Sequence, residues 1–104
     1  MKNRMSFHGL LPVGSVVRIA DIEKRLMIIG RVLKPEGEDY IHDYCSVPFP
    51  EGYLDDEHLI FHEHSDISYI CRVGYINDSE MELEERLEAF LQEKRGFGPQ
   101  SGAF

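Results

Sequence analysis

Three histidines lie close together in the middle of the chain, in the stretch DDEHLIFHEHSD over residues 55–66. His58, His62 and His64 have carboxylates on both sides, and histidine with aspartate or glutamate is a ligand set that zinc enzymes use. On a strand over 59–64 the side chains of His62 and His64 would project from one face, and His58 could join them from the preceding turn. The stretch therefore raises the hypothesis of a metal-binding protein or a metal-dependent enzyme.

The same stretch also fits a strand that carries no chemistry. Its residues alternate, so that Ile60, His62 and His64 share one face while Phe61 points to the other, and the histidine face would then be the solvated side of an edge strand. No HExxH motif and no cysteine cluster accompanies the histidines, and a His-rich tract is a matter of composition rather than of ligand spacing. We therefore predict no metal and no cofactor, and keep His58, His62 and His64 as the alternative.

Other residue types that could carry catalysis lack the neighbours they would need. Cys45 lies three residues after His42, and positions three apart on a strand face opposite sides, so the thiol and the imidazole do not meet locally. The serines have no GxSxG motif, and the glycines form no phosphate-binding loop. Neither cysteine belongs to a CxxC motif, which favours buried free thiols. The sequence thus predicts a protein that is not an enzyme.

The charge balance limits the class of partner. The 104 residues carry a formal net charge of -8 at pH 7, with 42% hydrophobic and 29% charged residues. This composition is globular, and the negative charge without a Lys/Arg cluster argues against nucleic acid and against a membrane surface. The N-terminal segment has no signal-peptide core, and no apolar run is long enough to span a bilayer. We therefore expect a cytoplasmic protein with a protein partner.

The pattern of apolar residues predicts one α+β domain over residues 10–95, with a flexible N-terminus at 1–9 and a mobile tail at 96–104. Five strands are expected within residues 10–19, 24–34, 40–47, 59–64 and 67–76. Gly30 in the middle of the second strand indicates a bulge or a bend. Short strands with tight connections predict a strongly bent antiparallel sheet or a small SH3-like barrel.

A change of period predicts a C-terminal amphipathic helix from about residue 79 to 95. The tetrapeptide SEME at its start matches a capping box, and Gly96 follows the last turn as a C-cap glycine. Its apolar stripe is expected to pack on the sheet. The stripe consists of Leu83, Leu87, Phe90 and Leu91. The charged face is rich in glutamate; it is either simply solvated or a docking face for a basic partner, for which Glu84 and Glu88 are the candidate contacts.

The loop PFPEGYL at residues 48–54 cannot continue a central strand, because its prolines lack the amide donor that a strand ladder needs. Aromatic side chains framed by prolines lose little entropy when a partner binds, so Phe49, Tyr53 and Leu54 are candidate partner contacts. The alternative is that these side chains form a lid over the core.

Several segments occur in an order that indicates a relationship: PVGSVV, LMIIGR, PEG, and the Asp66–Ile67 step before GY. Over about residues 10–95 the chain resembles a family of small uncharacterised proteins of Gram-positive bacteria (Firmicutes). Genes of that family tend to lie beside type VII secretion loci and their LXG-domain toxins. The resemblance implies a chaperone or targeting factor for such a toxin, without catalytic residues to carry over. A homodimeric SH3-like interaction module is a further alternative.

Overall fold

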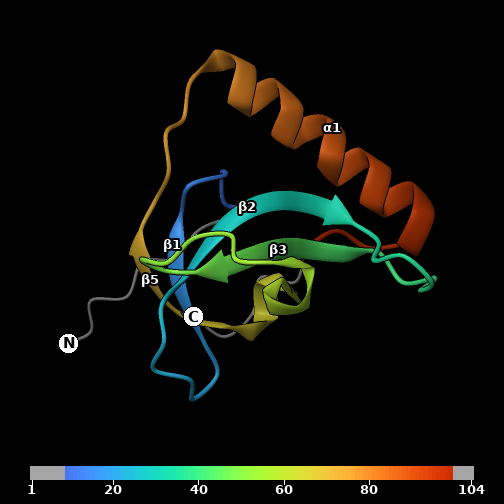
Figure 1. The fold of residues 1–104 in the computed structure, drawn as a ribbon. Helices are drawn as coiled ribbons and strands as arrows, with labels where there is room; N and C mark the ends of the chain where they lie inside the picture. Colours follow the sequence, from blue (N-terminus) through green and yellow to red (C-terminus); the bar gives the residue numbers. More distant parts are fainter. Residues whose placement is uncertain (1–8, 100–104) are drawn as a thin grey trace.

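The computed structural model describes residues 9–99, in which five antiparallel strands form one sheet in the order β4-β3-β2-β1-β5. The strands are β1 (Val16–Ile19), β2 (Leu26–Leu33), β3 (His42–Pro48), β4 (Ile60–His62) and β5 (Ile67–Arg72). β4 and β5 are the two edges of the sheet, which curves without closing (Figure 1). The predicted α+β class is confirmed, and the sheet is the open form rather than the closed barrel.

Strand β2 contains the bulge that its glycine predicted. Its pairing with β3 shifts register between Ile28 and Gly30. Shortly after the bulge, Val32 has a φ of 57°, a left-handed conformation that β-branched residues rarely adopt. These irregularities allow β2 to bend while it stays paired with β3 along its whole length.

Two predicted strands are shorter in the structure. The strand expected over 59–64 is only β4, and a 3₁₀ turn, η2 (His64–Asp66), follows it. The strand expected over 67–76 ends with β5, after which Gly74 N donates to Ser15 Oγ at 2.9 Å. A Cβ at position 74 would collide with the backbone of Val13, so glycine is what allows the chain to pass so close to the turn before β1.

The core joins the segment before β1, four strands and the helix. Its buried members are Leu10, Leu11, Val17, Leu26, Ile28, Tyr44, Ile67, Ile70 and Leu91. β3 is the most enclosed strand, because every residue from Asp43 to Val47 is buried. Removal of these apolar side chains from water is the main force that holds the sheet in its curved form.

Helix α1 (Asp78–Arg95) begins and ends with side-chain and glycine caps. Asn77 Oδ1 accepts from Glu80 N at 3.0 Å, so the N-cap lies two residues before the serine of the expected capping box. Gly96 has a φ of 84° and is the C-cap that the sequence predicted. Within the described residues no helix is long and apolar enough to cross a membrane.

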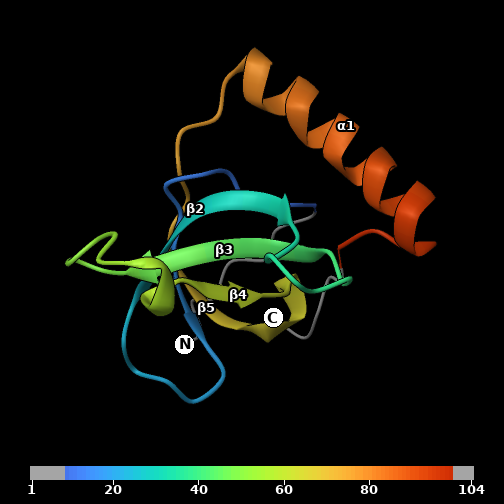
Figure 2. The ribbon, with the colours of Figure 1, turned by 45° about the vertical axis from the view of Figure 1, so that its right-hand side comes forward.

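The helix lies above the sheet on the side of β2 (Figures 1 and 2). Leu91 is fully buried and Leu87 is half-buried, whereas Leu83 and Phe90 remain 45% and 41% exposed. The expectation that the whole apolar stripe packs on the sheet was therefore wrong for two of its four residues. Polar contacts hold the helix at an angle that brings only part of the stripe to the core.

The predicted flexible ends, 1–9 and 96–104, lie mostly outside the described residues. In the part of the tail that the structure describes, the guanidinium of Arg95 lies 4.5 Å from the ring centroid of Phe97. Arg95 Nη2 also donates to the carbonyl of Gly98 at 3.2 Å. The first residues after the helix thus pack against its last side chain.

Candidate functional site

The three histidines take different partners. His58 is exposed in a 3₁₀ turn, η1 (Asp56–His58), where its Nδ1 lies 2.6 Å from Asp55 Oδ1. His62 Nε2 lies 2.8 Å from Ser46 Oγ, and His62 and His64 are only 3% and 0% exposed. The histidine face of the edge strand is therefore buried, and the prediction that it is solvated was wrong. β4 is at the edge of the sheet, but the side chain of His62 lies on the buried face of the sheet, beside Ser46 of β3.

Hydrogen bonding and burial fix the inner histidines in place within the fold. The hydroxyl of Tyr44 accepts from Leu11 N at 2.9 Å and lies 2.6 Å from His64 Nδ1. Burial raises the pKa of Tyr44, so its hydroxyl keeps its proton and can donate it to His64 Nδ1. Burial also lowers the pKa of His62, which favours a neutral ring. In residues 9–99 no group of three His, Cys, Asp or Glu side chains is placed to hold a metal.

A buried ion pair joins the sheet to the end of the helix. Arg95 Nη2 donates to Asp43 Oδ1 at 2.8 Å, and His64 N donates to the other oxygen of the same carboxylate at 2.9 Å. Arg95 Nη1 donates to the carbonyl of Ile41 at 3.0 Å. The sequence analysis did not find this cluster, because its members are far apart along the chain and each looks like an ordinary residue of its own element.

Cys45 and His42, the candidate thiol and imidazole, have different surroundings. Cys45 is a buried free thiol, and burial raises its pKa, which leaves it a weak nucleophile. His42 instead pairs with Glu63 and Glu38. Partial burial lowers the pKa of His42, but the two carboxylates outweigh that effect and the net shift is upward.

Glu84 and Glu88 face the N-terminal segment rather than open solvent. Glu84 Oε2 accepts from Leu10 N at 2.9 Å, and a Cβ at Gly9 would collide with both carboxylates. Both side chains are half-buried. A hydrogen bond to Glu84, together with burial and the charge of Glu84, raises the pKa of Glu88 to about 7. These two candidate partner contacts are thus engaged within the molecule.

The Glu84–Glu88 pair predicts a pH dependence of stability. The pKa of Glu88 is higher in the folded state than its ordinary value of 4.5. The stability that its protonated carboxyl contributes is therefore fully present below pH 4.5 and is lost as the pH rises through about 7. The substitution Glu88→Gln keeps an uncharged hydrogen-bond donor at every pH. We therefore expect the urea midpoint of the variant, relative to the wild type, to rise between weakly acidic and weakly alkaline pH.

Glu93→Gln is the matched control for this measurement, since Glu93 is exposed on the same helix. It should leave the pH dependence of the urea midpoint as in the wild type. If the urea midpoints of Glu88→Gln and the wild type differ by the same amount at both pH values, protonation of Glu88 does not contribute to stability.

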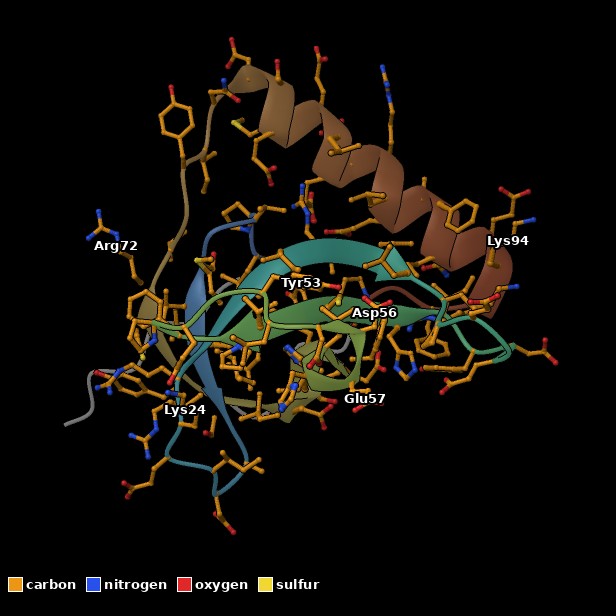
Figure 3. All side chains as sticks on the ribbon, in the orientation of Figure 1. Lys24, Tyr53, Asp56, Glu57, Arg72 and Lys94 are labelled. Carbon is orange, nitrogen blue, oxygen red and sulfur yellow. The ribbon has the colours of Figure 1, made fainter. Side chains whose placement is uncertain are left out.

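The loop at residues 48–54 is fixed at several points and still exposes its apolar side chains. Phe49 N donates to the carbonyl of Arg25 at 2.9 Å, and Gly52 N donates to the carbonyl of Pro48 at 2.7 Å. Tyr53 donates from its hydroxyl to Asp56 Oδ1 at 2.6 Å (Figure 3). The three predicted contacts remain open: Phe49 is 40%, Tyr53 59% and Leu54 52% exposed.

The exposed loop and the glutamates of α1 do not form one site. Figures 1 and 2 show α1 on one side of the sheet, and Figure 2 shows the loop extending beyond the arrowhead end of β3. Phe49, Tyr53 and Leu54 also lie outside the core cluster and the side chains packed on it. The structure thus presents the loop as an open surface rather than as a lid.

Comparison with known protein families gives a match over most of the chain. A family described as Domain of unknown function (DUF4176) matches residues 10–83. The matched segment contains all five strands, the loop at 48–54 and the first turns of α1. No curated protein and no solved structure matches the chain.

Proposed function

The chain belongs to the DUF4176 family, and we propose that it is a non-catalytic binding protein that holds a partner protein through the loop at residues 48–54. The observation that carries this proposal is the combination of exposure and fixation in the loop. Phe49 is held by a backbone hydrogen bond to Arg25, and Tyr53 by its hydroxyl on Asp56. Because the backbone at Phe49 and the ring of Tyr53 are already held in place, binding costs less conformational entropy than it would in a free loop.

The proposed client is an LXG-domain toxin of a type VII secretion system, which the chain would chaperone or target in the cytoplasm before export. The support for this client is the resemblance of PVGSVV, LMIIGR and the neighbouring segments to proteins encoded beside such toxins. The net charge of -8 would favour a client with a basic surface around the apolar contact, because complementary charges steer association.

The placement of the reactive side chains supports a binding role over the metal-dependent alternative. A metal site would need His58, His62 and His64 to converge. His58 instead pairs with Asp55, and His62 lies against Ser46 in the interior. Their ring nitrogens already serve as hydrogen-bond partners that the fold uses.

The test is the affinity for the LXG domain of a toxin from the same cells, measured by calorimetric titration. Phe49→Ala combined with Tyr53→Ala should weaken binding by roughly 30-fold or more, since exposed aromatic anchors carry much of the energy of an interface. Tyr75→Ala is the matched control, because Tyr75 is also aromatic and 81% exposed but lies before α1. It should leave the affinity unchanged.

Two outcomes would separate the parts of the proposal. No binding of any LXG domain by the wild-type protein would overturn the client. Tight binding that is insensitive to the double substitution would keep the client and overturn the loop as its contact. Circular dichroism of the double variant should match the wild type, because neither side chain belongs to the core.

A further inference from the structure

The loop at residues 48–54 changes from apolar to acidic at its end. Its exposed apolar side chains are followed directly by three exposed carboxylates. These are Asp55, Asp56 and Glu57. In residues 9–99, the lysines and arginines that form ion pairs take other carboxylates. The acidic end of the loop therefore has no lysine or arginine of its own chain beside it.

The fold uses one of these three carboxylates and leaves two of them open. Asp55 accepts from His58 N at 3.0 Å and lies 2.6 Å from His58 Nδ1. Asp56 uses only Oδ1, which accepts from the Tyr53 hydroxyl at 2.6 Å. The Glu57 carboxylate has no hydrogen bond or ion pair within the part of the chain that the structure describes. We call Asp56 and Glu57 the open carboxylates.

The hydrogen bond between Tyr53 and Asp56 places a negative charge at the edge of an exposed aromatic ring (Figure 3). This bond raises the pKa of Tyr53, so the hydroxyl keeps its proton and remains the donor. The face of an aromatic ring attracts a cation. A guanidinium that stacks on the ring keeps its N–H groups free to pair with a carboxylate beside the ring. One arginine side chain can therefore use both the ring and the charge.

An apolar neighbour completes the site that this arginine would need. An ion pair at an exposed position contributes little by itself. Leu54 follows Tyr53 in the chain and is 52% exposed, so an apolar side chain beside the arginine gains by covering it. The loop thus offers an aromatic ring, two carboxylates and an aliphatic surface next to one another. This combination matches a segment that is both apolar and basic.

We propose that the loop recognises a client segment in which an arginine neighbours an apolar residue. The guanidinium lies on the ring of Tyr53 and pairs with the open carboxylates, and the apolar side chain packs on Leu54. This inference rests on the proposed function, because it names the chemistry that the client presents to the same loop.

The first test uses the blocked tripeptide acetyl-Leu-Arg-Leu-amide as the probe. It is titrated into the full chain, and the backbone amide signals are followed by NMR. Saturable shifts are expected at residues 49–58. The analogue with citrulline in place of arginine has the same shape without the charge and should bind more weakly by roughly 5-fold or more. Absence of saturable shifts in this loop, or equal affinity of the citrulline analogue, overturns the proposal.

The second test removes the open carboxylates. Asp56→Asn combined with Glu57→Gln should weaken binding of the tripeptide by roughly 5-fold or more. Glu82→Gln combined with Glu85→Gln is the matched control, because it changes the net charge by the same amount at exposed positions of α1. It should leave the affinity unchanged. Equal weakening by both pairs would mean that only the net charge matters, and it would overturn the site.

The same variants separate this inference from the proposed function. An LXG domain that binds through Phe49 and Tyr53 but is insensitive to Asp56→Asn combined with Glu57→Gln would overturn the arginine contact and keep the proposed function. Binding of the tripeptide at the loop, with no LXG domain bound by the wild-type protein, would keep the arginine contact and overturn the proposed client.

Discussion

Replacing Asp43 by alanine is expected to lower the free energy of unfolding by about 3 kcal/mol, because the buried Arg95 loses its closest charged partner and keeps only the longer contact with Glu63 at 3.5 Å. The Asp43 side chain is fully buried and that of Arg95 is 6% exposed. Without the carboxylate, the Arg95 guanidinium and the backbone N–H of His64 both lose an acceptor. Urea unfolding of the variant, followed by circular dichroism, measures the loss.

Two further variants make this result specific to the buried pair. Asp43→Asn keeps one acceptor oxygen and should lie between alanine and the wild type. Lys24→Ala removes an ion pair with Glu51 in which both side chains are about half exposed, and it should not change stability measurably. Similar losses for Asp43→Ala and Lys24→Ala would show that the buried pair has no special role.

Much of the fold follows from local patterns. β2 is apolar on both faces and contains a glycine, which predicted both a central strand and its bulge. Gly96 predicted the end of the helix for a local reason, since a left-handed residue closes the last turn. The sequence did not decide between an open sheet and a closed barrel. Closure depends on whether β4 pairs with β5, and no local pattern determines that pairing.

The burial of the histidines and the buried ion pair depend on long-range contacts. His64 bonds to Tyr44, 20 residues away, and Arg95 to Asp43, 52 residues away. Alternation along one strand assigns residues to faces, but it does not say which face the rest of the chain will cover. The prediction for the histidine face was wrong for this reason.

The sequence around Glu84 contains a local indication that its side chain points toward the core. Glu84 precedes Leu87 by three residues and Leu91 by seven, so it lies on the same face as the two stripe residues that do reach the core. The partner of its carboxylate, the backbone N–H of Leu10, could not be read from the sequence. The loop at 48–54 was found more completely, because its prolines and aromatics are contiguous and its exposure needs no distant partner.

Leu91→Ala is expected to cost about 2–5 kcal/mol of unfolding free energy, because it opens a cavity at a fully buried position. Leu91 is the one residue of α1 that is fully buried, and it packs in the core with Leu10 and Tyr44. Leu83→Ala removes the same atoms from a side chain that is 45% exposed. Its cost should stay within about 0.5 kcal/mol.

The comparison of these two leucines decides how α1 is attached. A large loss at Leu91 with little loss at Leu83 means that the Leu87–Leu91 side of the helix and the ion pairs of Arg31 and Arg95 hold it on the sheet. The flank with Leu83 and Phe90 is then available to another molecule. Equal losses at both positions would mean that the sheet already covers this flank in solution.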